Sequence, residues 1–186
     1  MTPHFTIITP TVLRPSLLRA CESVNTQTFT SWQHIILLDC EISDDLIGKI
    51  AHRQRQVYRC ERPHQNWGHT CRHAAYGLVK GDFIYHLDDD NFFPDNKVLE
   101  DLKDVQAPWA IFPILRYGEK FFNDPPGKRK TDTGSFIVKR EYGKWIDSPA
   151  YDTDGDVVEQ LLRNHPNYQS LPDMRPLMVM EKSGGM

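Results

Sequence analysis

Short apolar runs rich in β-branched residues alternate with segments of helical spacing through the first half of this chain. The strand-like runs are residues 5–9, 34–38, 57–60 and 83–87, and helical spacing is seen at residues 17–24, 46–50 and 69–79. The strand-like runs are apolar on both faces, which is typical of parallel strands covered by helices on both sides of a sheet. This alternation predicts an α/β fold with a mostly parallel central sheet flanked by helices.

The pattern changes after Asp90. Helical spacing at residues 96–105, with Asp95 as the expected N-cap, is followed by strand candidates at 110–115 and 135–139 and by a helix over 157–162. The Gly-, Pro- and Lys-rich residues 117–133 show no periodicity, and loops of that length are usually functional or mobile. A chain of 186 residues is long enough to bury a substantial core, so we expect one domain over residues 1–186.

Composition argues against several other classes of protein. Lys and Arg total 22 against 25 Asp and Glu, a formal net charge of -3, so no broad basic surface for nucleic acid is expected. No apolar stretch approaches the roughly 20 residues that cross a bilayer, and no signal-peptide pattern opens the chain, so we expect no transmembrane segment and a cytoplasmic location. Zinc is not expected either, because no CxxC pair occurs among Cys21, Cys40, Cys60 and Cys71.

Three adjacent carboxylates, Asp88, Asp89 and Asp90, follow the fourth strand-like run. Crowded carboxylates repel one another unless a cation, hydrogen-bond donors or free water compensates. Alternation along an extended chain places Asp88 and Asp90 on the same side, and Mg²⁺ or Mn²⁺ often takes one or two carboxylates together with substrate phosphates. The alternative is a solvated acidic turn with Asp95 capping the next helix.

Polar residues also follow two other strand-like runs. Thr9 and Pro10 end the first run and Asp39 ends the second. Ligands of open α/β sheets lie beyond the carboxyl ends of the strands. The sequence therefore predicts a binding site at the edge of the sheet where these residues and the three carboxylates meet.

Three longer segments contain the motifs that identify a family resemblance. They are TIITPTVLRPSLLRACESVNTQTF at residues 6–29, IILLD at 35–39 and NWGHTCRHAAYGLVKGDFIYHLDDDNFFPD at 66–95. Together the segments resemble the family 2 glycosyltransferases, which have the Rossmann-like GT-A fold. The resemblance covers roughly residues 4–100 strongly and the rest weakly. It implies a nucleotide-binding half over about residues 1–95 and an acceptor-side half over about 96–180.

The resemblance implies roles for residues around the donor. Thr9, Pro10 and Asp39 would line the nucleoside pocket, with Arg14 near the same pocket. Arg72 would contact the base or the diphosphate, since a guanidinium suits phosphate oxygens; a surface residue on an amphipathic helix is the alternative.

A metal ion, Mn²⁺ or Mg²⁺, is also implied. Asp88 and Asp89 would address the ribose and metal-bound water, and Asp90 would be the direct metal ligand, although the division among the three stays open. His165, after the last helix, is a candidate additional metal ligand, and a structural role is the alternative for a His that precedes Pro166.

The resemblance further implies a base that deprotonates the acceptor hydroxyl. Asp154 aligns best with the family's base and Asp156 is the second candidate, while helix capping explains one of these acids without catalysis. Tyr151 is a candidate acceptor contact. Trp67, Trp109 and Trp145 could stack on a base or a sugar ring, although packing is the more common role for any one of them.

The expected function is that of a metal-dependent, inverting glycosyltransferase. It would move a sugar from a nucleoside-diphosphate sugar, with a UDP-sugar favoured, to a hydroxyl acceptor. One alternative is a catalytically silent nucleotide-sugar-binding domain. The other is a sugar nucleotidyltransferase, which needs a Gly-rich phosphate loop that residues 9–14 lack.

The chain also departs from the family pattern. His73 and Cys40 replace a common Asn and Asp, Thr153 replaces the Glu of an acid pair, and the Gln-x-x-Arg-Trp signature of processive synthases is absent. The chain is also short for the family, so a minimal acceptor-binding part is expected, and this leaves the acceptor open.

Overall fold

The computed structural model describes residues 2–41, 44–60 and 66–181. Two sheets, five α-helices and three short 3₁₀ helices make up this part of the chain. The α-helices are α1 (Leu17–Asn25), α2 (Asp44–Lys49), α3 (His69–Ala75), α4 (Val98–Leu102) and α5 (Thr153–Asn164), and the 3₁₀ helices are η1 (Tyr76–Leu78), η2 (Thr133–Ser135) and η3 (Arg140–Tyr142).

The seven-stranded main sheet has the order β10-β6-β9-β4-β1-β2-β3. Its strands are β1 (Phe5–Thr11), β2 (Trp32–Leu38), β3 (Arg55–Arg59), β4 (Phe83–His86), β6 (Trp109–Ile111), β9 (Phe136–Lys139) and β10 (Gln169–Ser170). β9 pairs antiparallel with β4 and β6, and the other pairs are parallel. The predicted α/β fold with a mostly parallel sheet is therefore confirmed.

The strand order reverses at β1, because β2 and β3 lie to one side of it and β4 to the other. Such a reversal opens a crevice beyond the carboxyl ends of β1 and β4, where open α/β sheets bind ligands. A second sheet has the order β5-β11-β7-β8, and its first strand, β5, follows closely on the carboxyl end of β4. It consists of β5 (Asn91–Phe92), β11 (Val179–Met180), β7 (Ile114–Arg116) and β8 (Glu119–Phe121).

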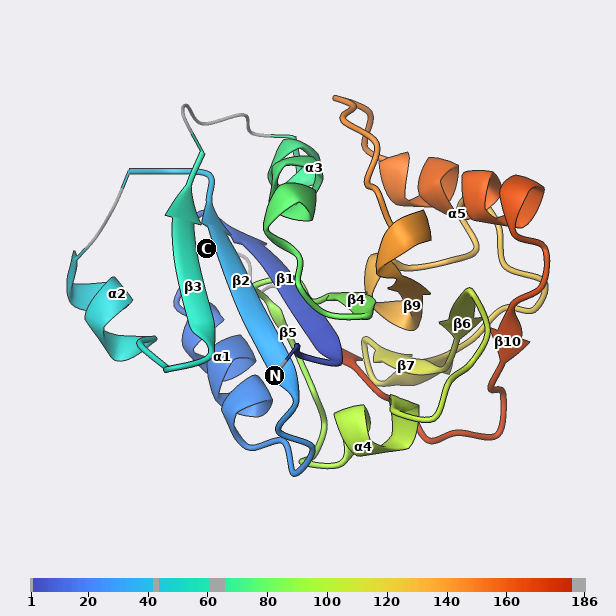
Figure 1. Cartoon of the computed structure of the whole chain (residues 1–186), viewed down its shortest axis with the longest axis horizontal. Helices are drawn as coiled ribbons and strands as arrows, with labels where there is room; N and C mark the ends of the chain where they lie inside the picture. Colours follow the sequence, from blue (N-terminus) through green and yellow to red (C-terminus); the bar gives the residue numbers. More distant parts are fainter. Residues whose placement is uncertain (1, 42–43, 61–65, 182–186) are drawn as a thin grey trace.

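Side chains of the main sheet alternate between apolar cores on its two faces. Phe5 and Ile7 of β1 pack into one core, which α1 and α4 cover, and Ile8 packs into the other, which α3 and α5 cover (Figure 1). This explains why the strand-like runs are apolar on both faces.

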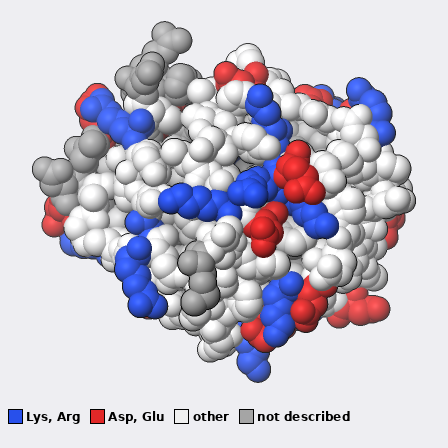
Figure 2. Space-filling model, in the orientation of Figure 1, with Lys and Arg blue, Asp and Glu red and all other residues white. Residues whose placement is uncertain are grey.

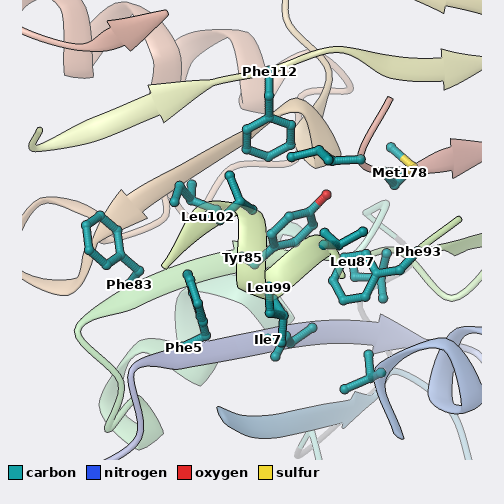
Figure 3. Close-up of a cluster of buried hydrophobic side chains, with 14 of the residues drawn as sticks. Phe5, Ile7, Phe83, Tyr85, Leu87, Phe93, Leu99, Leu102, Phe112 and Met178 are labelled. Atoms are coloured by element: carbon teal, nitrogen blue, oxygen red, sulfur yellow. The ribbon is translucent and has the colours of Figure 1, made fainter. Parts of the chain in front are cut away.

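Tyr85 of β4 joins the two halves of the chain inside the first core (Figure 3). Its ring stacks on Phe112 at 5.8 Å and meets the edge of Phe93 at 5.0 Å between ring centroids. The buried Tyr85 hydroxyl donates a hydrogen bond to the carbonyl oxygen of Gly134 at 2.9 Å. Residues on both sides of position 95 therefore share one core.

Several element boundaries differ from the sequence predictions. β1 continues through Pro10 to Thr11, and the strand predicted at 110–115 is divided between two sheets, because Pro113 offers no N–H to a strand ladder. The predicted loop at 117–133 contains β8. α4 begins at Val98 with Lys97 as its N-cap; the predicted cap, Asp95, instead accepts the N–H of Lys97 at 2.8 Å. α5 begins at Thr153, four residues before the predicted start.

Among residues 2–41, 44–60 and 66–181, no helix is both long and apolar enough to cross a membrane. On the face drawn in Figure 2, Lys and Arg side chains lie beside Asp and Glu side chains and form no field of one sign.

Candidate functional site

A cavity of about 680 Å³ opens at the carboxyl ends of β1 and β4. It lies at the reversal of strand order described above. Its wall brings together groups from the strand ends, the start of α3, the β7–β8 hairpin, the loop before η2 and the start of α5. The sequence-predicted site residues in this wall are Pro10, Arg14, Asp39, Trp67, Arg72, Asp88, Asp89, Asp90, Tyr151 and Asp154.

Thr9 does not belong to this wall. Its side chain is fully buried and its hydroxyl lies 3.0 Å from Nε2 of His34. Thr11, two residues further along β1, reaches the end of the strand and lines the cavity instead. The nucleoside-pocket role expected for Thr9 is therefore corrected, because its side chain is enclosed by the neighbouring strand.

Asp89 connects the end of β4 to the end of β1 through its side-chain hydrogen bonds. Its carboxylate accepts the Thr11 hydroxyl at 2.6 Å and Nη1 of Arg14 at 2.9 Å, and its side chain is 4% exposed. Burial raises the pKa of Asp89, while the hydrogen bond from Thr11 and the charge of Arg14 oppose the rise. Asp89 is thus held by the protein itself at the switch point.

Arg72 pairs with Asp88 at the floor of the cavity. The guanidinium is 3% exposed, its Nη2 contacts Oδ1 of Asp88, and its Nη1 donates to the carbonyl oxygen of Trp67 at 2.8 Å. The Nε of Arg72 is buried with no hydrogen-bond partner in the described part of the chain. The same guanidinium lies 5.1 Å from the ring centroid of Trp145. Arg72 is a buried, oriented cation facing the carboxylates and not a surface residue of its helix.

Asp90 is the most exposed of the three carboxylates, with a side-chain exposure of 36% against 29% for Asp88. It forms an ion pair with Nη1 of Arg14 at 3.2 Å. Burial and the charges of Asp88 and Asp89 raise the pKa of Asp90. Burial is the larger cause of this rise, and the charge of Arg14 opposes it.

Asp154 and Asp156 lie in the first turn of α5 with different surroundings. Asp154 lines the cavity, accepts the N–H of Gly155 at 2.8 Å and lies 3.3 Å from the Thr133 hydroxyl. Burial raises its pKa. Asp156 instead pairs with Nζ of Lys128 at 2.6 Å and is not part of the cavity wall.

His165 is not brought to the cavity. It caps the other end of α5, about 16 Å from Asp154 at 1.5 Å of rise per residue. Its ring packs on Tyr142 at 3.9 Å between centroids, and its carbonyl oxygen accepts the indole N–H of Trp109. The metal role expected for His165 is replaced by a structural one.

Asp132 also lines the cavity. From the sequence, residues 132–135 fit either part of the donor-sugar or acceptor wall or a simple turn. Burial raises the pKa of Asp132 to about 6, and the charges of Asp88 and Asp154 add to the rise. Arg116 and Arg129 also line the wall. Cys60 and Cys71 meet with their Sγ atoms 2.8 Å apart beside Asp39, although their spacing in sequence gives no sign of this.

A family model described as glycosyl transferase family 2 matches residues 6–157. No curated protein matches the chain. Residues 1–349 of S. aureus TarS in complex with UDP-GlcNAc superpose with a TM-score of 0.77 at 15% identity, over 98% of this chain and 60% of that one.

A second solved structure is the mannosyltransferase PcManGT from Pyrobaculum calidifontis in complex with GDP-Man and Mn²⁺. It superposes with a TM-score of 0.72 at 16% identity, over 99% of this chain and 59% of that one. At such identities the likeness shows a shared fold. The chain spans about 60% of the length of these two solved chains.

Proposed function

The chain belongs to glycosyl transferase family 2, and from this premise we propose that it transfers a sugar from a nucleoside-diphosphate sugar to a hydroxyl acceptor, with a divalent cation and with inversion. One observation carries the proposal. Three carboxylates and the buried Arg72 lie at the switch point of the sheet, and the carboxylate of Asp154 faces the same cavity. The family match covers most of the chain, so the nucleotidyltransferase alternative is not retained.

The donor is proposed to lie between the ends of β1 and β2 and the carboxylates of β4. Pro10 and Asp39 would hold the nucleoside, and Arg72 would face the diphosphate, where a buried guanidinium offers planar donors to phosphate oxygens. TarS was solved with UDP-GlcNAc and PcManGT with GDP-Man, so UDP and GDP are the nucleotides to test first, with UDP favoured.

The residues present fit a hard divalent cation. Asp90 is half-exposed to the cavity, its pKa is raised by burial and by the neighbouring carboxylates, and Asp88 lies beside it. Oxygen ligands of this kind suit Mn²⁺ or Mg²⁺. We assign Asp90 as the main ligand and Asp88 as the second. When bound, the ion would neutralise the charge that develops on the leaving diphosphate.

Asp154 is the proposed base. In an inverting transfer the acceptor oxygen attacks the anomeric carbon as the bond to the diphosphate breaks, and the acceptor proton passes to a carboxylate on the acceptor side. The raised pKa of Asp154 makes it a better proton acceptor than an ordinary Asp. The contact with Thr133 and the N–H of Gly155 orient its oxygens. Asp156, neutralised by Lys128, is not retained as the base.

The test is a thermal-shift series with UDP, GDP, dTDP, CDP and ADP, each with and without Mn²⁺. One diphosphate is expected to raise the melting temperature in the presence of the metal only, since binding to the folded state alone stabilises it. Asp90→Ala should lose the metal-dependent part of the shift. The exposed Asp104, outside the cavity wall, supplies the matched control Asp104→Ala, which should keep the whole shift.

A metal-independent shift that Asp90→Ala retains would remove Asp90 from the proposed metal site. Binding without hydrolysis or transfer would instead favour the silent nucleotide-sugar-binding domain. The cytoplasmic location and the lack of a nucleic-acid partner remain predictions from the sequence.

A further inference from the structure

Exposed aromatic rings gather at the mouth of the cavity. In the described part of the chain, the large apolar side chains that stay exposed are Val12, Leu18, Trp67, Tyr117 and Tyr151, and all but Leu18 line this cavity. Trp67 is 58% exposed and Tyr151 72%. Exposed apolar groups scattered singly need no explanation, but a concentration around one cavity marks a contact surface.

Trp67 and Tyr151 come from distant segments and meet edge to face. Their ring centroids lie 5.2 Å apart at an interplanar angle of 81°. Trp67 precedes α3 and Tyr151 precedes α5, and in Figure 1 the loop before α5 rises beside the start of α3. We refer to Trp67 and Tyr151 together as the aromatic pair.

Hydrogen bonds between the two segments hold the aromatic pair in place. The Thr70 hydroxyl donates to Asp147 at 2.7 Å, and the Asn66 side chain reaches the carbonyl oxygen of Ser148 at 3.4 Å. Further along α3, Nδ1 of His73 lies 2.7 Å from the carbonyl oxygen of Trp145. The rings are thus positioned by the fold before any ligand binds, which lowers the entropic cost of binding.

The backbone of Trp67 is itself in an unfavourable conformation, with φ at 54°. Its carbonyl oxygen accepts Nη1 of Arg72, and the following Gly68 has φ at 77°. A non-Gly residue in this region is strained and persists where the surroundings fix it, commonly at functional sites. The fold therefore holds this ring at the cavity mouth at a cost in stability, while leaving most of it uncovered.

The polar groups beside the aromatic pair narrow the class of ligand. Asp152 follows Tyr151 directly, Arg129 lies 3.7 Å from the Asp152 carboxylate, and both line the cavity. A lipid chain would be poorly matched by charged groups at this spacing. A pyranose ring offers apolar C–H groups to an aromatic face and hydroxyls to carboxylate and guanidinium groups at its edge.

We propose that the aromatic pair binds a sugar ring of the acceptor, so that the acceptor is a saccharide. This inference rests on the proposed transferase function, and it places the acceptor next to Asp154, three residues after Tyr151 in the sequence. Stacking of the donor's nucleobase on Trp67 is the competing occupant, and the experiment below separates the two.

Trp67 provides its own spectroscopic probe. The other three tryptophans, Trp32, Trp109 and Trp145, are at most 3% exposed, so iodide quenching of tryptophan fluorescence reports mainly on Trp67. The probes are cellobiose, N,N′-diacetylchitobiose, maltose and mannobiose, each added with saturating nucleotide and Mn²⁺. Sorbitol is the control, because it carries hydroxyls without a ring face.

At least one disaccharide is expected to protect Trp67 saturably, and sorbitol is expected not to. Tyr151→Ala should lower the affinity for the protecting disaccharide about 5- to 10-fold, which corresponds to about 1 kcal/mol for an aromatic contact. Tyr151→Phe should restore the affinity because it keeps the ring. Both variants should retain the nucleotide-dependent thermal shift.

Two outcomes would overturn the inference while leaving the donor site intact. In the first, nucleotide alone protects Trp67 fully from iodide quenching, which would show that the indole ring stacks on the nucleobase of the donor. The other is a normal nucleotide shift with no protection by any disaccharide. A wild-type protein that shows no nucleotide-dependent shift would contradict the proposed function itself, and the inference with it.

Discussion

Asp154 and Asp156 are two residues apart in the first turn of α5, yet their partners separate them. Asp156 is neutralised by Lys128, while Asp154 lines the cavity together with Arg72 and Asp88. A general base typically contributes 10²- to 10⁴-fold to a rate. We expect Asp154→Asn to lose at least about 100-fold in transfer rate while its nucleotide thermal shift is retained.

Asp156→Asn is the matched control for that variant, because it makes the same chemical change two residues further along the first turn of α5. It should stay within about 5-fold of the wild-type rate, since loss of an ion pair with a partly exposed lysine has small effects. Equal losses in the two variants would contradict the assignment of the base.

Asp132 gives a pH-dependent prediction at the same scale. Burial raises its pKa from 3.8 to about 6, with Asp88 and Asp154 adding to the rise and Arg116 opposing it. The folded state therefore binds this proton more tightly than the unfolded state. The resulting stability is fully present below pH 3.8 and is lost as the pH rises through about 6.

Asp132→Asn removes the titration and can still accept the N–H of Gly134, a hydrogen bond of 3.1 Å in the wild type. At pH 7.5 the variant should be more stable by about 1 to 3 kcal/mol, and this gain should shrink at pH 4.5. Denaturant unfolding at the two pH values measures it. A gain that does not change with pH would show that the charge of Asp132 is not the cause.

Among the structural elements, the start of α3 depends on close approach to β1. Gly68 caps this helix with φ at 77°, and a Cβ there would lie 2.6 Å from the Pro10 ring and 3.2 Å from Nη1 of Arg72. Gly68→Ala should therefore destabilise the protein by about 2 to 4 kcal/mol, combining backbone strain with overpacking.

The matched control is Gly77→Ala in η1, where a Cβ would meet nothing within 4 Å. This variant should stay within about 0.5 kcal/mol of the wild type. Denaturant unfolding of both variants checks the pair. Equal free energies of unfolding for Gly68→Ala and Gly77→Ala would contradict this prediction, because they would show that the contact between α3 and β1 adjusts to an added methyl group at little cost.

At the scale of the whole molecule, the proposed nucleotide-binding and acceptor-side halves share one sheet and one core. β9 of the second half pairs with β4 of the first, and Phe5, Tyr85, Phe112 and Met178 belong to the same apolar cluster. The two halves are therefore expected to unfold together, as single small domains usually do.

We predict one calorimetric transition for the full chain, with equal calorimetric and van't Hoff enthalpies. Residues 1–95 alone should lack fixed tertiary packing, because their β4 edge and Tyr85 would be uncovered. Near-UV circular dichroism of that fragment measures this packing. Native-like near-UV signal in the fragment would show that the first half is an independent domain.

The sequence by itself determined the α/β architecture and the edge of the sheet at which the candidate site lies. Both follow from local information: apolar runs on two faces predict buried parallel strands, and polar residues after those runs must come out at the carboxyl edge. Pro10, Asp39 and the three carboxylates were placed correctly at this edge for that reason.

Only the tertiary structure decided which polar groups meet there. Contacts between distant segments decide whether Thr9 or Thr11 reaches the cavity. They also decide which of Asp154 and Asp156 pairs with Lys128, and which exposed rings meet. Such contacts leave no periodic trace in the sequence, because packing between elements fixes them and local conformation does not. The same reason separates His165 from the carboxylates, since the length of α5 lies between them.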